Sequence, residues 1–172
     1  SEIQREVEQL DTKISLEKAR VTLGTVPALA GVTWQLDRDA HWAVIGPNGS
    51  GKSTFLRLIR GELHPDQKDG GSRIYRLTGE EQRTPIGLRR RIGLVSGELQ
   101  ERYLFHEWNI PALNVVLTGF FDTPLLYESP TAEQRKRAFT ILGLLGISDL
   151  SDRPFLSLSQ GQARKVLLAR AL

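Results

Sequence analysis

The sequence contains no cysteine and no methionine, and only 7% of its 172 residues are aromatic. The lack of cysteine excludes disulfides, thiolate metal sites and a cysteine nucleophile. No apolar run approaches the roughly 18 residues that a helix needs to cross a bilayer. The first residues also lack the charged and then apolar segments of a secretory signal. We therefore expect an intracellular protein that crosses no membrane.

Neither sign of charge dominates, since the formal net charge is only +3. This mild positive charge is compatible with a polyphosphate ligand, a nucleic acid or an anionic membrane surface, and it does not choose among them. The densest basic cluster is Arg89–Arg91, which we interpret as a solvated helix end rather than a binding patch.

A helix stop signal is missing at the end of the sequence. Residues 166–172 are good helix formers and include no Gly, Asn or Pro. The first residue is not methionine. We interpret the sequence as the front portion of a longer chain, and its length predicts a single domain over residues 1–172.

Strands alternate with helices in the first half of the chain, which predicts an α/β fold. Strands are expected at 14–23, 32–36, 42–45, 74–77 and 92–95, and the apolar run 42–45 is typical of a strand buried on both faces. Residues 52–63 have the spacing of an amphipathic helix. Residues 1–13 read as a short helix or a frayed arm, and residues 64–72 as a turn-rich loop.

The second half of the chain is predicted to be mostly helical. Residues 99–127 are rich in aromatic side chains, with a helix start near Pro111. The clearest helix spans 131–145, because Thr131 and Gln134 have the spacing of a capping box. Gly146 then supplies the stop.

Residues 46–54 match the phosphate-binding pattern G-x-x-x-x-G-K-[ST] in full. They are Gly46, Pro47, Asn48, Gly49, Ser50, Gly51, Lys52, Ser53 and Thr54. Glycines let the backbone turn tightly and point successive N–H groups at phosphate oxygens, and the start of a helix favours an anion. Lys52 adds a positive charge, and the Ser53 hydroxyl can coordinate Mg²⁺. The alternative, a glycine-rich turn that binds nothing, explains a full match between an apolar run and an amphipathic helix less well.

A second motif stands at residues 158–162, which read Leu-Ser-Gln-Gly-Gln before a helical run at 163–172. Taken alone, Ser159 is explained as an ordinary helix N-cap. Together with the phosphate-binding loop at 46–54, called the P-loop below, the segment resembles the signature L-S-G-G-Q of the ABC ATPase family. Ala28-Leu29, residues 46–49, the sequence Arg-Ile-Gly at 91–93 and the run 163–172 also resemble that family, so the resemblance covers essentially the whole chain.

Two further segments, 116–122 and 154–159, resemble the cytoplasmic ATP-binding proteins of molybdenum transport or photorepair, which usually carry two ABC domains in tandem. The resemblance implies a P-loop NTPase fold of ABC type with an antiparallel β portion and a helical subdomain, truncated after the signature helix. It assigns residues 14–98 to a β-rich P-loop core, 99–157 to the helical subdomain and 158–172 to the signature helix.

The resemblance also implies ATP and Mg²⁺ as cofactors and a second ABC domain, as homodimer or tandem domain, as partner. In such a pair, Ser159, Gly161 and Gln162 of one domain contact the nucleotide on the P-loop of the other. The complete protein is then an ATP hydrolase that drives transport, related to molybdate, with a membrane permease at the inner face of the cell membrane. The alternatives are a non-transport switch that acts on nucleic acid or a protein complex, and a catalytically dead nucleotide sensor.

The sequence departs from the family pattern at three visible positions. Leu23 stands where the family stacks an aromatic side chain on adenine, and leucine covers a purine by apolar contact alone. Gly97 stands where the family has its Q-loop glutamine. Either Glu98 or Gln100 substitutes for it or both are plain surface residues, and this departure weakens the case for a standard permease partner. Gln160 replaces the first signature glycine, which we expect to be tolerated.

The acidic residues that split ATP in this family are expected after Leu172, so no residue of this chain is assigned a catalytic role. Asp149 and Asp152 are expected to cap or solvate a turn, and His41, His64 and His106 have no metal-ligand spacing. We expect the chain to bind ATP without hydrolysing it. Since later strands would cover a sheet edge, we also expect the isolated piece to be poorly stable or prone to association.

Overall fold

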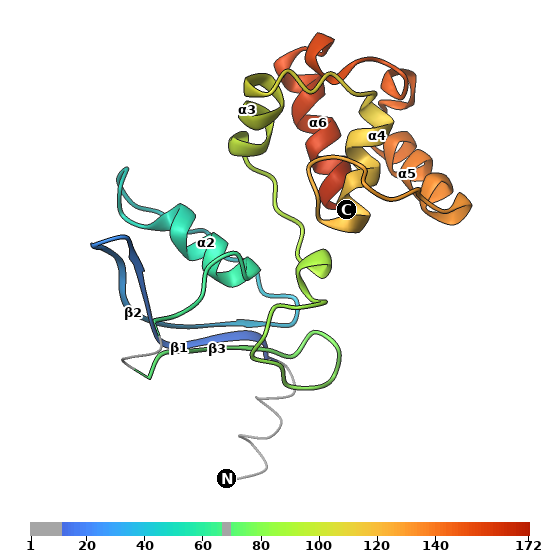
Figure 1. The fold of residues 1–172 in the computed structure, drawn as a ribbon. Helices are drawn as coiled ribbons and strands as arrows, with labels where there is room; N and C mark the ends of the chain where they lie inside the picture. Colours follow the sequence, from blue (N-terminus) through green and yellow to red (C-terminus); the bar gives the residue numbers. More distant parts are fainter. Residues whose placement is uncertain (1–11, 67–69) are drawn as a thin grey trace. The chain divides into compact units, whose positions relative to one another are not determined.

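The computed structural model describes residues 12–66 and 70–172, which form two compact units, Ser1–Arg89 and Arg90–Leu172. Among the described residues, the first unit contains three strands and one α-helix, and the second unit is helical (Figure 1). The two secondary-structure classes therefore divide along the chain as the sequence predicts.

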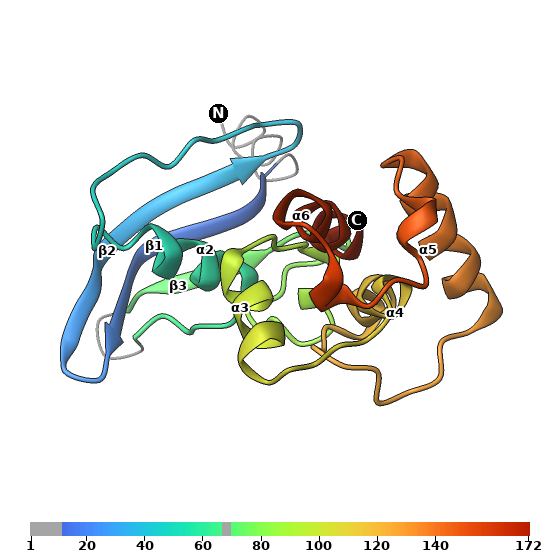
Figure 2. The same ribbon diagram turned by 90° about the horizontal axis from the view of Figure 1, so that it is seen from above.

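The sheet of the first unit is antiparallel. Strands β1 (Thr12–Leu23) and β2 (Val26–Asp37) form a hairpin, and β3 (Ser72–Tyr75) pairs with the other side of β1, giving the order β2-β1-β3. Figure 2 shows the three strands side by side. The predicted strands at 14–23 and 32–36 are confirmed. The second is longer than predicted because pairing with β1 recruits Pro27 and Ala30, which have low strand propensity by themselves.

A bulge in β1 keeps its apolar residues on one face. Ile14 and Leu16 are buried, and so are Ala19 and Val21, although the step from 16 to 19 breaks the two-residue period. The pairing with β2 shifts between Leu16 and Ala19, and Lys18 within that step has φ 43°. The bulge thus accommodates one extra residue in β1. In a regular strand, Ala19 and Val21 would lie on the opposite face of the sheet from Ile14 and Leu16.

Helix α2 (Lys52–Arg60) covers one face of this sheet (Figure 1). Phe55 and Leu58 of α2 share a core with Leu16, Ala19 and Val21 of β1 and with Leu29 of β2. The predicted helix at 52–63 is confirmed, and it ends at Gly61, which has φ 89°. The first unit therefore holds one apolar layer between helix and sheet.

The second unit is built around a short buried helix. It contains α3 (Gly97–Phe105), α4 (Ala112–Leu117), η3 (Thr118–Phe121), α5 (Ala132–Leu144), η4 (Ser148–Leu150), η5 (Phe155–Ser157) and α6 (Gln160–Ala171). Five of the six residues of α4 are buried, and α4 packs against both α5 and α6. The expected helix start near Pro111 is confirmed, since Pro111 is the N-cap of α4.

The ends of the long helices follow their sequence signals. Thr131 and Gln134 form the predicted capping box at the start of α5, with both hydrogen bonds present. Gly146 follows α5 with φ 65°, as a helix stop requires. Arg89–Arg91 forms a short 3₁₀ helix, η2, without a buried residue, as expected of a solvated helix end.

Two predicted strands are wrong. Residues 42–45 are not in a strand, and the side chains of Trp42 and Ile45 are 61% and 92% exposed. Residues 92–95 form no strand either, and Val95 is 46% exposed. A strand buried on both faces needs a sheet to pair with and covering elements on both faces of that sheet, and the sheet in the described part of the chain contains β1, β2 and β3 only.

The N-terminal prediction of a helix or frayed arm at 1–13 lies outside the described residues except for residues 12 and 13, which belong to β1. Of the predicted loop at 64–72, the described part is free of regular structure until β3 begins at Ser72. Across residues 12–66 and 70–172, none of the helices is both long and apolar enough to span a bilayer.

Candidate nucleotide-binding site

The loop before α2 depends on its glycines. Gly49 and Gly51 have φ 82° and 87°, a backbone region that other residues rarely adopt. A Cβ atom on Gly51 would lie 2.7 Å from the carbonyl oxygen of Ala28 in β2, and one on Gly46 would lie 2.7 Å from Oγ of Ser50. The loop therefore packs against the sheet at a point where only a glycine fits.

Helix α2 begins without a side-chain cap. Its N-cap is Gly51, and its first turn contains no acidic residue. The N–H of Phe55 donates the first helical hydrogen bond to Gly51 O, at 2.8 Å. The N–H groups of Lys52, Ser53 and Thr54 precede that bond and have no acceptor within the helix. Such a helix start attracts an anion through its free donors and its dipole.

Lys52 lies across this loop. Its Nζ donates to Gly46 O at 2.8 Å and to Pro47 O at 2.6 Å. The ammonium is therefore held beside the same backbone turn whose N–H groups precede α2. Ser53 is exposed at the start of the helix, where its hydroxyl can coordinate a metal ion that is bound to phosphate.

Leu23 lies at the same end of the first unit as this loop. It is 43% exposed and pairs with Val26 across a two-residue hairpin turn. Strand β2 runs two residues from Val26 to Ala28, a distance of about 7 Å. The carbonyl oxygen of Ala28 is the nearest atom that a Cβ on Gly51 would meet. Val26 is 63% exposed and adds apolar surface that we did not predict. The two residues between Leu23 and Val26 could have indicated this added surface, because a two-residue hairpin turn makes the residues that flank it cross-strand neighbours.

Ser159 is the N-cap of α6. Its Oγ accepts from the N–H of Gln162 at 3.3 Å, and Gln162 Oε1 accepts from the N–H of Ser159 at 3.0 Å. Gly161 is exposed, and a Cβ added there would meet no atom within 4 Å. Gln160 is exposed as well. The signature residues thus form an accessible helix start in the second unit, while the P-loop belongs to the first.

Gln100 lies close to the signature helix. A groove in the second unit is lined by Gly97 and Gln100 of α3 and by Gln160 and Arg164 of α6. Gln100 is half-buried in it, whereas Glu98 is exposed. Of the two residues considered as substitutes for the missing Q-loop glutamine, Gln100 is therefore the one that faces the signature.

Known proteins share this fold and these motifs. The sequence profile of the ABC transporter family matches residues 29–172. The chain belongs to this family. The resemblance inferred from residues 46–54 and 158–162 is thereby confirmed, and the fold is an α/β P-loop fold of ABC type with an antiparallel sheet and a helical part.

Individual relatives support the assignment. The ABC transporter ATP-binding protein ModF of Escherichia coli (strain K12) is 34% identical over 163 residues, which make up 94% of this chain and 32% of ModF. The structure of CbiO1 from Clostridium perfringens, part of the ABC transporter complex CbiONQ, has a TM-score of 0.70 and 26% identity over 94% of this chain and 61% of that one. A dimeric bacterial ABC transporter cassette has a TM-score of 0.68 and 25% identity over 92% of this chain and 68% of its own. The chain thus spans about a third of ModF and less than two thirds of CbiO1.

The described part of this ABC domain contains no cluster of side chains that could hold a metal ion by itself. Among residues 12–66 and 70–172, no group of three or more His, Asp and Glu side chains could hold a metal ion. Asp149 and Asp152 are exposed beside the turn before the signature. The residues of the P-loop fit a nucleotide-bound Mg²⁺, since Ser53 supplies an exposed hydroxyl beside the free N–H groups and phosphate oxygens complete such a site.

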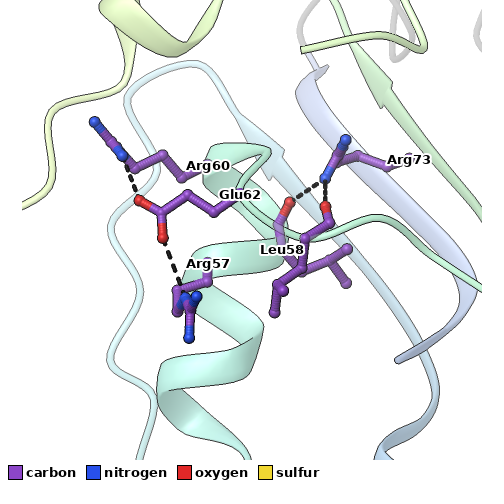
Figure 3. Close-up of polar contacts among 6 residues, drawn as sticks. Arg57, Leu58, Arg60, Glu62 and Arg73 are labelled. Atoms are coloured by element: carbon purple, nitrogen blue, oxygen red, sulfur yellow. Dashed lines mark hydrogen bonds and ion pairs between the residues drawn. The ribbon is translucent and has the colours of Figure 1, made fainter. Parts of the chain in front are cut away.

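Strand β3, which overlaps the strand predicted at 74–77 and begins two residues earlier, holds the other end of α2. This contact was not predicted from the sequence. Nη1 of Arg73 donates to the carbonyl oxygens of Leu58 and Leu63, each at 2.5 Å (Figure 3). Glu62 is paired with Arg57, at 3.1 Å, and with Arg60 in the same view. Burial lowers the pKa of Arg73 from its ordinary value, and the nearby Tyr75 partly raises it again. The signal that could have found this contact is the alternation of Arg73 and Tyr75 in a short strand, which places both on one face.

Proposed function

We propose that this chain is the ATP-binding part of an ABC system and that it binds Mg-ATP at residues 46–54. The observation that carries the proposal is the geometry of that loop. Two left-handed glycines lead into a helix start without a side-chain cap, and Lys52 lies across the turn. Free N–H groups, a helix dipole and a lysine converge there on one place, which suits a polyphosphate.

Each residue has a role in this proposal. The backbone N–H groups of the loop bind phosphate oxygens, Lys52 adds the positive charge near the β- and γ-phosphates, and Ser53 ligates Mg²⁺. The apolar side chains of Leu23 and Val26 cover the adenine face without aromatic stacking, so we expect weak discrimination among bases. Mg²⁺ supplies charge neutralisation when it is bound.

Hydrolysis belongs to the complete protein in this proposal. We propose that a second ABC domain, in tandem or as a second copy, faces the nucleotide with Ser159, Gly161 and Gln162. The exposed helix start at Ser159 suits a γ-phosphate through the positive end of its dipole, and the Ser159 hydroxyl, which caps the N–H of Gln162, can also donate a hydrogen bond to a phosphate oxygen. Closure of the pair then depends on the γ-phosphate and drives transport through a membrane permease at the cytoplasmic face, with molybdate as a candidate substrate.

A second candidate function is a non-transport switch that acts on nucleic acid or on a protein complex. The observation that favours it is the glycine at position 97, where the family has the glutamine that reports to a permease. Binding of DNA or RNA that weakens steeply with salt would support the switch. Co-purification of the complete protein with an integral membrane protein would support transport.

Nucleotide binding can be tested directly with a matched pair of lysine variants. We expect Lys52→Ala to weaken the binding of Mg-ATP at least tenfold, because it removes the charge beside the loop. Lys165→Ala, at an exposed position of α6, should leave the Kd within twofold. Equal Kd values for the two variants, or no saturable binding by the unmodified chain, would contradict the proposal.

A further inference from the structure

The C-terminal end of α2 is closed by side chains from β3. Tyr75 Oη donates to Ile59 O at 2.8 Å, and Arg73 Nη1 donates to Leu58 O. Gly61 N donates to Leu58 O as well, and Glu62 N donates to Arg57 O at 2.9 Å. The carbonyl groups of residues 57–59 thus all have partners, and two of the three have a partner from β3.

The side-chain hydrogen bonds of Arg73 within the described residues go to α2 and to the turn that follows it, at Leu58 O and Leu63 O. Arg73 is 3% exposed, its Nε and Nη2 have no hydrogen-bond partner among the described residues, and its guanidinium carbon lies 5.1 Å from the ring centroid of Tyr75. Burying a charge with two unused donors opposes folding. An apolar residue at this position would avoid that cost, but it would leave the carbonyl oxygens of Leu58 and Leu63 without their Arg73 partner.

Helix α2 connects Arg73 with the phosphate site. The helix has nine residues and is about 13 Å long, so a tilt of about 5° at its C-terminal end moves its first turn by about 1 Å. Donors in a binding site must be held within about 0.5 Å of their working positions. A cation at the C-terminal end also complements the helix dipole, whose positive end faces the loop.

We propose that Arg73, together with Tyr75, is a positioning residue for the phosphate site. It fixes the axis of α2 against β3 and thereby holds the N–H groups at residues 52–54 and the Lys52 ammonium in place for the phosphates. It touches no nucleotide and acts only through the helix. This inference rests on the proposed ATP site at the other end of α2.

The test measures the Kd for Mg-ATP and for Mg-ADP together with the free energy of unfolding. Arg73→Met keeps an unbranched side chain and removes the donors, and it should raise both Kd values roughly tenfold. Arg76→Met is the matched control, because Arg76 contacts Glu81 and Ser15 rather than α2, and its Kd values should stay within twofold. Tyr75→Phe removes only the hydroxyl contact with Ile59 and should raise the Kd values about threefold.

A purely structural role predicts a different pattern. Leu142→Ala destabilises the helical unit at a buried position outside the core that includes α2, and its Kd should stay within twofold at temperatures where the protein is folded. If Arg73→Met lowers stability and leaves the Kd within twofold, the inference is wrong.

A more conservative variant tests the same inference if Arg73→Met does not fold. Arg73→Lys keeps the charge and loses the planar guanidinium that donates to Leu58 and Leu63, and its Kd for Mg-ATP is then measured. A Kd raised about threefold supports positioning, and an unchanged Kd refutes it. Failure of the unmodified chain to bind nucleotide would instead refute the proposed function, so the two failures are distinguishable.

Discussion

Single atoms decide which residues the P-loop accepts. Gly49 and Gly51 both have a positive φ, but the space around them differs. A Cβ atom on Gly49 would meet nothing within 4 Å, whereas one on Gly51 would press on the backbone of Ala28. The sequence pattern requires only the first and last glycines of the motif, Gly46 and Gly51, and the structure gives the steric reason for Gly51.

This difference predicts unequal effects of alanine at the two positions. Gly49→Ala should cost about 1–2 kcal/mol, the price of a left-handed backbone for an L-residue. Gly51→Ala should cost more, about 3 kcal/mol, because backbone overlap adds to the same strain. Urea denaturation of both variants measures the difference in the free energy of unfolding. Equal costs would show that Ala28 does not constrain the loop.

Two buried tyrosines predict an alkaline limit to stability. Burial raises the pKa of Tyr75 and of Tyr103 above the ordinary value of 10.0. Below pH 10 both hydroxyls are protonated in the folded and the unfolded chain, so they add no pH dependence. Above it the unfolded chain ionises first, and stability falls by up to about 1.4 kcal/mol per pH unit for each tyrosine.

The measurement is the free energy of unfolding between pH 8 and pH 11. Tyr75→Phe should reduce the alkaline slope, since one of the two groups no longer ionises. Tyr127→Phe, at a side chain that is 72% exposed, should leave the slope unchanged. A slope that is the same in all three proteins would show that burial of Tyr75 does not control its ionisation.

At the scale of helices and strands, local signals were sufficient where the element needs no distant partner. The predicted capping box of α5, the N-cap of α6 at Ser159, the stop at Gly146 and the start of α4 after Pro111 all depend on residues within one turn, and the structure has each of them. The strands predicted at 42–45 and 92–95 depend on neighbours far along the chain, and the structure has neither. The contact of Arg73 with α2 depends on tertiary approach and was missed for the same reason.

The two capping boxes offer a test of the signature. Ser159→Ala and Thr131→Ala each remove one N-cap hydroxyl, and each should cost about 1 kcal/mol of stability. Only Ser159→Ala should also reduce ATP-dependent association of the complete protein with a second ABC domain, measured by sedimentation. If Thr131→Ala reduces that association equally, the loss reflects stability and Ser159 has no separate role.

At the scale of the molecule, the chain holds two separate cores. One packs Phe55 and Leu58 of α2 on the sheet, and the other surrounds α4 in the helical unit. The family pattern predicted this division into a β-rich part with the P-loop and a helical part with the signature. What it left undetermined is substrate and partner, because neither motif contains a residue that would recognise anything other than a nucleotide.

The central proposal is that residues 46–54 bind Mg-ATP and that no side chain among the 172 residues splits it. One sample tests both halves if ATP binding and phosphate release are followed together, with Lys52→Ala as control. The account predicts saturable binding that Lys52→Ala weakens at least tenfold and no phosphate release above the buffer rate. Phosphate release that depends on Lys52 would contradict it, because an acid within these 172 residues would then be catalytic.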